Sequence, residues 1–259
     1  MRFHTTVAAL AVALLSGCNV IQQLESRKIM AAAVLASPSL APFTPASVTT
    51  AQLFFGERKD DLQQPPSALS ASSATLTWDG NSSGVALTPV AGKAGWYEAT
   101  GGVTYIQGAH YTFTVVYQGE TFSGSVQAPA ASAITNASNH VFNPGAYDGT
   151  KLTVTRDVSA GASDAFYSAF HASGANDLAS STCNNAPVDD ASVFVQFVLD
   201  DSAWKAASFA LPKSPCFPST GQYVVNLTTV EKSTAVSSNL FFGSAVLAGT
   251  ADAAALAVP

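Results

Sequence analysis

Three histidines beyond the first apolar run could serve acid–base chemistry: His110, His140 and His171. An imidazole that contacts a hydroxyl and a carboxylate activates the nucleophile of many hydrolases, and the three groups can come from distant positions of a chain. No local spacing joins these histidines to a zinc or phosphate-binding signature such as His-Glu-x-x-His or Gly-x-x-x-x-Gly-Lys. We therefore assign no catalytic residue and expect each histidine at the surface or at a strand edge.

Acidic side chains occur in pairs that could offer oxygen ligands to a cation. Asp189-Asp190 and Asp200-Asp201 flank an apolar run, but the residues between them would span roughly 25 to 30 Å if extended, too far for both pairs to reach one ion. A third pair, Asp60-Asp61, ends the charge run 56–61, which could be a cation-binding loop or a solvated hairpin tip that protects a sheet edge. We favour solvated carboxylates in all three places and expect no metal site and no cofactor.

Cys18 closes a segment that has the three parts of a signal peptide: a basic start at Arg2, an apolar core at 7–15 and two small residues. The core is far shorter than the ~20 residues that a membrane-spanning helix needs. The string Leu15-Ser16-Gly17-Cys18 resembles the lipobox of bacterial lipoproteins. The resemblance implies that residues 1–17 are removed and that Cys18 carries a diacylglycerol and an N-terminal acyl chain, palmitate for example, as a permanent anchor. An ordinary secretory signal beside a chance cysteine is the alternative.

The same resemblance implies an address in the cell envelope. Asn19 is not the Asp that signals inner-membrane retention in the enteric lipoprotein pattern, so it points to the outer membrane, with the protein facing the periplasm or the surface. Residues 18–28 are polar with scattered apolar side chains, which is typical of a tether.

The two other cysteines, Cys183 and Cys216, form an even pair in a chain expected to be exported. An oxidising compartment therefore predicts a disulfide between them. On the chain-entropy model, closing this loop would disfavour the unfolded chain by about 3 to 4 kcal/mol. Two free thiols are the alternative.

Charge limits the partners that the protein can take. Without residues 1–17 the chain has 10 basic and 17 acidic side chains, a formal charge of −7, so we expect no nucleic-acid binding. Charged residues are only 11% of the sequence, below the roughly 25% of an average soluble domain. Ser, Thr, Asn and Gln must then cover much of the surface, as in secreted β-proteins.

Short segments bounded by Gly, Pro and Asn predict strands along the whole chain. The main ones are 29–36, 48–55, 75–78, 84–90, 95–100, 111–117, 120–128, 151–156, 165–170, 193–199, 205–211 and 222–229. The clearest alternation lies in 111–117, where Tyr111, Phe113, Val115 and Tyr117 share a face opposite Thr112 and Thr114, so one face is buried and one is wet. Regular short strands of this kind predict an all-β fold, an antiparallel β-sandwich.

Glycine and aromatic residues between 75 and 129, notably Gly95-Trp96-Tyr97 and Gly108–Val115, are spaced in a way that resembles an immunoglobulin-like or transthyretin-like module. The resemblance implies two immunoglobulin-like modules, of a kind that serves bacterial surface lipoproteins as spacers or recognition units, and no functional residue carries over from it. Trp78, Trp96 and Trp204 could form a stacking platform for sugars, but tyrosines that alternate with threonines favour a sandwich core.

We divide the chain into a signal peptide (1–17), a tether (18–28), a first β-sandwich module (29–129), a linker (130–150) and a second module (151–259). The C-terminal run 240–258 is apolar and about long enough to span a bilayer. Asp252 would cost roughly 2.5 to 3.5 kcal/mol at mid-membrane, so we expect two core strands joined by a tight turn at Gly249 instead.

These expectations combine into one functional hypothesis. The protein is held to the membrane by lipid on Cys18 and acts as a non-catalytic binding or spacer module for an envelope protein or a polysaccharide. The alternative is an envelope hydrolase that uses one of the three histidines.

Overall fold

The computed structural model describes residues 28–39, 49–59, 66–157, 164–172, 183–184, 207–233, 236–241 and 243–259. Within these ranges nearly all regular structure is β-strand, and the one short helical segment is α3 (Lys213–Cys216). The predicted all-β sandwich class is confirmed. Residues 18–27 of the tether, Asp60-Asp61 and the strand expected at 193–199 lie outside the described residues.

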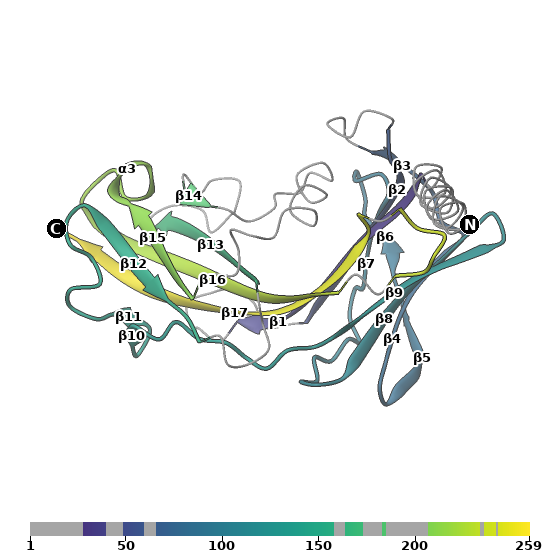
Figure 1. The fold of residues 1–259 in the computed structure, drawn as a ribbon, viewed down its shortest axis with the longest axis horizontal. Coiled ribbons are helices and arrows are strands. Elements are labelled where there is room, and N and C mark those ends of the chain that lie inside the picture. The colour runs from purple at the N-terminus through teal and green to yellow at the C-terminus, as the bar shows by residue number, and fades with distance from the viewer. Residues whose placement is uncertain are drawn as a thin grey trace, which may run out of the picture.

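The described strands form three sheets (Figure 1). The large sheet has the order β14 (Cys183–Asn184), β13 (Asp164–His171), β16 (Gly221–Ser233), β17 (Ala245–Val258), β1 (Ile29–Ser39), β2 (Thr50–Glu57), β7 (Trp96–Glu98), β6 (Thr88–Pro89). Three short strands add to it: β3 (Ser67–Ala68) pairs with β2, β11 (Val141–Phe142) pairs with β17, and β10 (Ala137–Ser138) pairs with β11. The second sheet has the order β5 (Asn81–Ala86), β4 (Ser73–Trp78), β8 (His110–Tyr117), β9 (Glu120–Gln127). The third pairs β12 (Lys151–Thr155) with β15 (Ser208–Pro212).

Most strand pairs of the large sheet are antiparallel, as predicted, and two pairs are parallel. β1 pairs with β17 in parallel, with Ala32 opposite Ala245, and β11 pairs with β17 in parallel through Val141 and Ala255. The first described strand thus lies beside the last one, a contact between distant segments that no local pattern encodes.

The first core lies between the four-stranded sheet and the part of the large sheet formed by β17, β1 and β2. The predicted alternation of β8 is present, because Tyr111, Phe113 and Val115 are buried while Tyr117 is half-buried. Leu35 and Phe55 meet them from the large sheet. These apolar faces explain why the period-two patterns fold into a sandwich.

The second core lies between the β12–β15 pair and the part of the large sheet formed by the first half of β16 and the second half of β17. Leu152 and Val154 of β12 pack with Leu211 of β15 against Val225 and Leu227 of β16.

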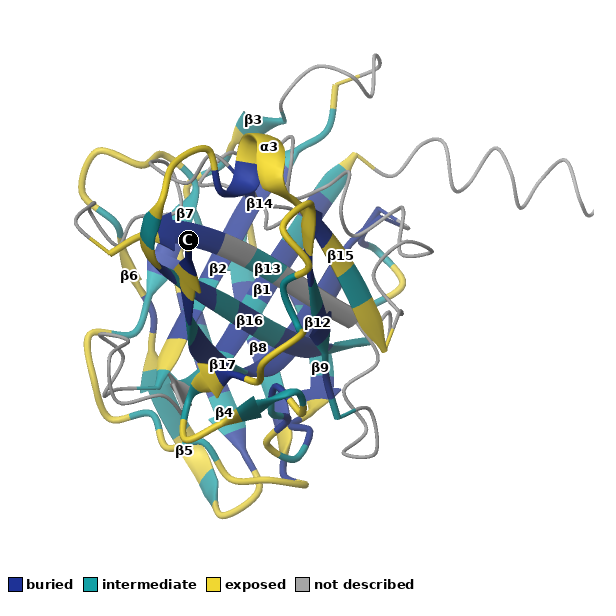
Figure 2. Ribbon diagram, turned by 90° about the vertical axis from the view of Figure 1, so that its left-hand side faces the viewer, coloured by how far each residue is buried: buried dark blue, intermediate teal, exposed yellow. Residues whose placement is uncertain are grey.

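β17 is long enough to belong to both cores (Figure 1), and in Figure 2 buried residues follow this strand. Val246 and Ala248 of β17 lie in the first core, whereas Ala254 and Leu256 lie in the second. At roughly 3.3 Å per residue, the 14 residues of β17 extend for about 45 Å. The two cores therefore share one continuous sheet.

The C-terminal apolar run is one strand, so the two strands with a turn at Gly249 that we predicted are wrong. Gly249 lies inside β17 opposite Val230, and a Cβ there would overlap the Thr229 carbonyl oxygen. The glycine permits a close approach of two strand backbones. In the described ranges, no helix has the length and apolarity needed to cross a membrane.

Candidate functional site

His110 forms an exposed pair with Asp79 at one end of the four-stranded sheet. Its Nδ1 lies 3.3 Å from Asp79 Oδ2, and the same oxygen accepts the His110 backbone N–H at 2.9 Å. These bonds lower the pKa of the Asp79 carboxyl, the backbone N–H bond most. Among the described residues, no hydroxyl lies within hydrogen-bond distance of the His110 ring, so the pair lacks the nucleophile of a hydrolase triad.

A serine near this pair has a spacing that the sequence reading missed. Gly80-Asn81-Ser82-Ser83-Gly84 matches Gly-x-Ser-x-Gly, the string that holds a nucleophilic serine on a strained strand-to-helix turn. Here the string forms the hairpin between β4 and β5, with Ser82 exposed on β5. The surrounding structure is a strand-to-strand turn, so the match does not create a nucleophile elbow.

His140 lies between the two cores, at the edge of β17. Its Nδ1 is 3.4 Å from Asp252 Oδ1 and 3.2 Å from the Ala253 carbonyl oxygen, and its side chain is 34% exposed. Asp252 Oδ2 accepts the Ile134 N–H at 2.9 Å, and Oδ1 accepts the Ala253 N–H at 2.8 Å. The Asp252 carboxylate therefore binds backbone groups. These bonds explain why an acidic residue occurs within a strand of mostly apolar residues.

His171 lies at the end of β13 far from the other two histidines in the sequence. Its exposed ring packs edge-on against Tyr223, with the ring centroids 5.0 Å apart. The structure thus distributes the three histidines over three places. His110 and His171 are exposed, as the sequence predicts, whereas His140 is half-buried in a turn beside β17.

The aromatic side chains favour the core over a sugar platform. Trp78 and Tyr111 are buried and stacked on each other, with ring centroids 5.8 Å apart. Trp96 is half-buried and packs against Phe54. Trp204 lies outside the described residues. Among the described residues, the large apolar side chains that are exposed are Ile106 and Val141 alone.

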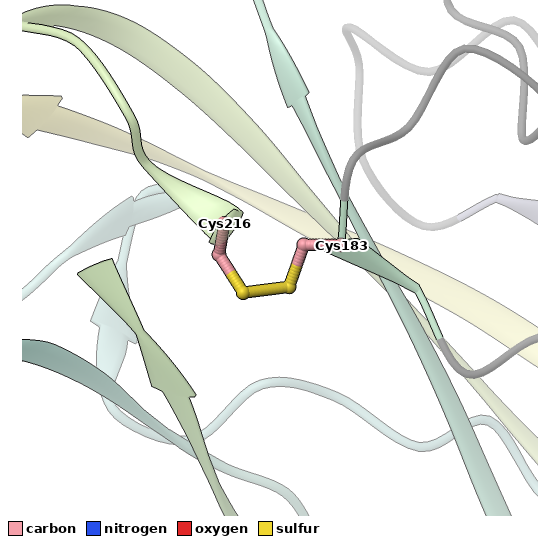
Figure 3. The surroundings of a disulfide bond; sticks show 2 residues. All are labelled: Cys183 and Cys216. Atoms are coloured by element: carbon pink, nitrogen blue, oxygen red, sulfur yellow. A yellow bond between two sulfur atoms is a disulfide. The ribbon is translucent and has the colours of Figure 1, made fainter. Parts of the chain in front are cut away.

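The structure joins Cys183 and Cys216 in the disulfide that the sequence predicts, with their Cα atoms 4.6 Å apart (Figure 3). The bond connects β14, at the border of the large sheet, with α3, which follows β15. It fixes a loop-rich end of the second core. Cys18, the expected lipid site, lies outside the described residues.

No metal site forms within the described parts of the chain, because no three His, Cys, Asp or Glu side chains gather there. The pairs Asp189-Asp190 and Asp200-Asp201 lie outside those parts. A cavity of about 10 Å³ in the first core is lined by apolar side chains such as Leu53, Phe113 and Val246. This volume is about the space of one water molecule, too small for a ligand.

Asp148 is an exposed acid whose carboxylate accepts several hydrogen bonds. Its Oδ1 accepts bonds from the Thr150 hydroxyl, the Thr150 N–H and the Lys151 N–H at 2.7 to 2.9 Å. These bonds, the hydroxyl bond first, lower the pKa of Asp148 to about 2. All three partners lie within three residues, so the group stabilises a turn and does not mark a catalytic acid.

No protein-family model matches the chain, and a search of curated proteins found no match either.

Proposed function

We propose that this protein is a lipid-anchored, non-catalytic module of the bacterial cell envelope, which holds a binding surface away from the membrane for an envelope protein or a polysaccharide. The lipobox-like string that ends at Cys18 supplies the address, and the outer membrane is the proposed location. The proposed mode of action is mechanical spacing and presentation, with no chemical step.

The observation that carries the proposal is the position of β1 relative to β17. β1 begins at Ile29, directly after the proposed tether, and runs parallel to β17 from its start. Val258 ends β17 at the opposite end of the sheet, beside Gly221. A chain anchored through residues 18–28 would therefore carry its second core on a continuous sheet about 45 Å long.

The immunoglobulin-like build of the first core remains part of the proposal. Its support is Tyr111, whose hydroxyl donates to the Thr104 carbonyl at 2.6 Å and accepts the Ile106 N–H at 2.7 Å. A tyrosine that binds the backbone a few residues upstream is a feature of immunoglobulin-like sandwiches. The second core supports no such comparison, so we limit the proposed likeness to residues of the first core.

Expression of the full chain in a bacterium that processes lipoproteins tests the anchor. We expect wild-type protein to incorporate labelled palmitate and to stay with the washed membrane fraction. Cys18→Ala should take no label and leave the membranes, whereas Ser16→Ala, which keeps a small residue and the cysteine, should behave as wild type.

A second variant removes any effect of an uncut signal segment. Replacing residues 1–18 by a cleaved secretory signal should yield a fully soluble exported protein. Unlabelled wild-type protein, or membrane association of this second variant, would refute the lipid anchor.

A further inference from the structure

Buried polar side chains gather between the two cores. Of the six buried polar or charged residues in the described chain, Ser132, Thr229, Thr250 and Asp252 lie at this junction together with Arg156, whereas Ser244 lies elsewhere. Burying such groups is unfavourable unless each finds a hydrogen-bond partner. The hydrogen-bond partners of these side chains therefore determine how the junction is arranged.

Alternate residues of β17 show how the junction is built. Side chains two apart on a strand share a face. Along one face, Val246 and Ala248 enter the first core and Ala254 and Leu256 enter the second. Between them, Thr250 and Asp252 are the polar members of the same row. The Thr250 hydroxyl lies 3.3 Å from the Thr229 hydroxyl of β16.

Residues 130–135, which we call the strap, cross this polar row. Ser132 donates its N–H to Thr250 Oγ1 at 3.1 Å, and Ile134 donates its N–H to Asp252 Oδ2 at 2.9 Å. The backbone of β17 pairs with β16 on one edge and with β1 and β11 on the other. Side chains are therefore the groups that β17 can offer to a segment on its face.

The odd residues of the strap bind a different sheet. Thr135 donates its N–H to the Thr155 carbonyl at 2.8 Å, and the Ala133 carbonyl accepts the Asp157 N–H at 2.9 Å. The Ser132 hydroxyl donates to the Asp157 carbonyl as well. The strap thus extends the β12–β15 sheet through the backbone of its odd residues and holds β17 through the backbone N–H groups of its even ones. It is therefore a hydrogen-bonded connection between these two layers.

We propose that Thr250 and Asp252 form a latch that fixes the β12–β15 layer on the long sheet through the strap. Asp252 is the central residue because both of its oxygens accept backbone N–H groups and His140 lies beside it. When the latch is open, the second layer moves against β17 while the first core keeps its structure. The latch is a property of the fold and does not depend on the lipid anchor.

Native-state hydrogen exchange of the full chain tests the latch. Thr250→Val keeps the side-chain shape and removes one acceptor, and Asp252→Asn removes the charge. We expect both variants to speed exchange of the Ile134 amide and of the β12 and β15 amides by about tenfold, the factor for one lost buried hydrogen bond, with little change in β4 and β8.

Ser244→Ala is the matched control, because buried Ser244 Oγ accepts the Ala31 N–H at 3.1 Å outside the latch. It should leave the β12 and β15 amides at the wild-type exchange rate. A latch variant that speeds exchange equally in β4, β8, β12 and β15, or in none of them, would overturn the proposal. Because Thr250→Val is nearly isosteric, it keeps the test decisive if Asp252→Asn fails to fold.

Discussion

At Tyr111 one hydroxyl connects a core strand to the loop before it. The ring is fully buried, and burial raises the pKa of its hydroxyl, partly offset by the bond from Ile106. The hydroxyl therefore works as a neutral donor and acceptor. It fixes the loop 104–106 on the aromatic stack of the first core.

Tyr111→Phe should destabilise the protein by about 1 to 3 kcal/mol, because the Ile106 N–H and the Thr104 carbonyl lose their partner. Chemical denaturation followed by fluorescence measures the free energy of unfolding. Tyr117→Phe, which removes an exposed bond to Gln118, is the control and should change little. Equal effects of the two substitutions would contradict the role of the Tyr111 hydroxyl.

Asp148 makes part of the stability depend on pH. Its folded pKa of about 2 lies below the ordinary value of 3.8, so its contribution is complete above the ordinary value and is lost as the pH falls toward 2. Asp148→Asn should be less stable than wild type near neutral pH, and the difference should shrink between pH 3.8 and 2. Urea midpoints across this range test it, with the exposed hairpin variant Glu120→Gln as control. A difference that stays constant with pH would exclude the carboxylate as its source.

At the scale of elements, β17 decides how the halves of the molecule are joined. Its composition of small apolar residues permits close packing on both sides, and its backbone pairs with β16 along its whole length. At Gly249 the backbone of β16 leaves no room for a Cβ.

Gly249→Ala should therefore force β16 and β17 apart and cost about 2 to 3 kcal/mol or prevent folding, since the added Cβ meets a backbone oxygen. Gly80→Ala is the matched control: a Cβ at Gly80 meets no atom, and the cost is that of a left-handed conformation alone, about 1 kcal/mol. Thermal unfolding compares the two. A smaller effect at Gly249 than at Gly80 would show that the strands can relax.

At the scale of the whole molecule, two cores share one curved sheet, and the disulfide restrains the end of the second core (Figure 1). The two cysteines are 33 residues apart in the sequence. The bond therefore acts mainly on the unfolded chain, which loses the freedom of that loop.

Replacing both Cys183 and Cys216 by Ser should lower the free energy of unfolding by about 3 to 4 kcal/mol. Denaturant titration of wild-type protein with and without reductant measures the same quantity, and reductant should leave the double variant unchanged. Wild-type protein whose midpoint does not respond to reductant would contradict a stabilising disulfide.

The sequence alone was enough for the all-β class, for most strands and for the pairing of Cys183 with Cys216. These properties follow from local patterns or from counting: alternating side chains show which face is buried, and two cysteines allow one pairing. The core positions of Tyr111 and Phe113 followed for the same reason. The lipid address at Cys18 is also a local motif, and it stays a prediction.

Only the tertiary structure decided the parallel pairing of β1 with β17, the continuity of β17 through Gly249 and the partners of Asp252. The reason is the same in each case. The local sequence around Gly249 fits a strand as well as a turn, and the segment that packs against it decides between the two. Here that segment is β16, whose Thr229 carbonyl leaves no room for a Cβ at residue 249. Asp252 likewise owes its burial to the Ile134 amide, 118 residues away, and such contacts form only when the folded chain brings the strap onto β17.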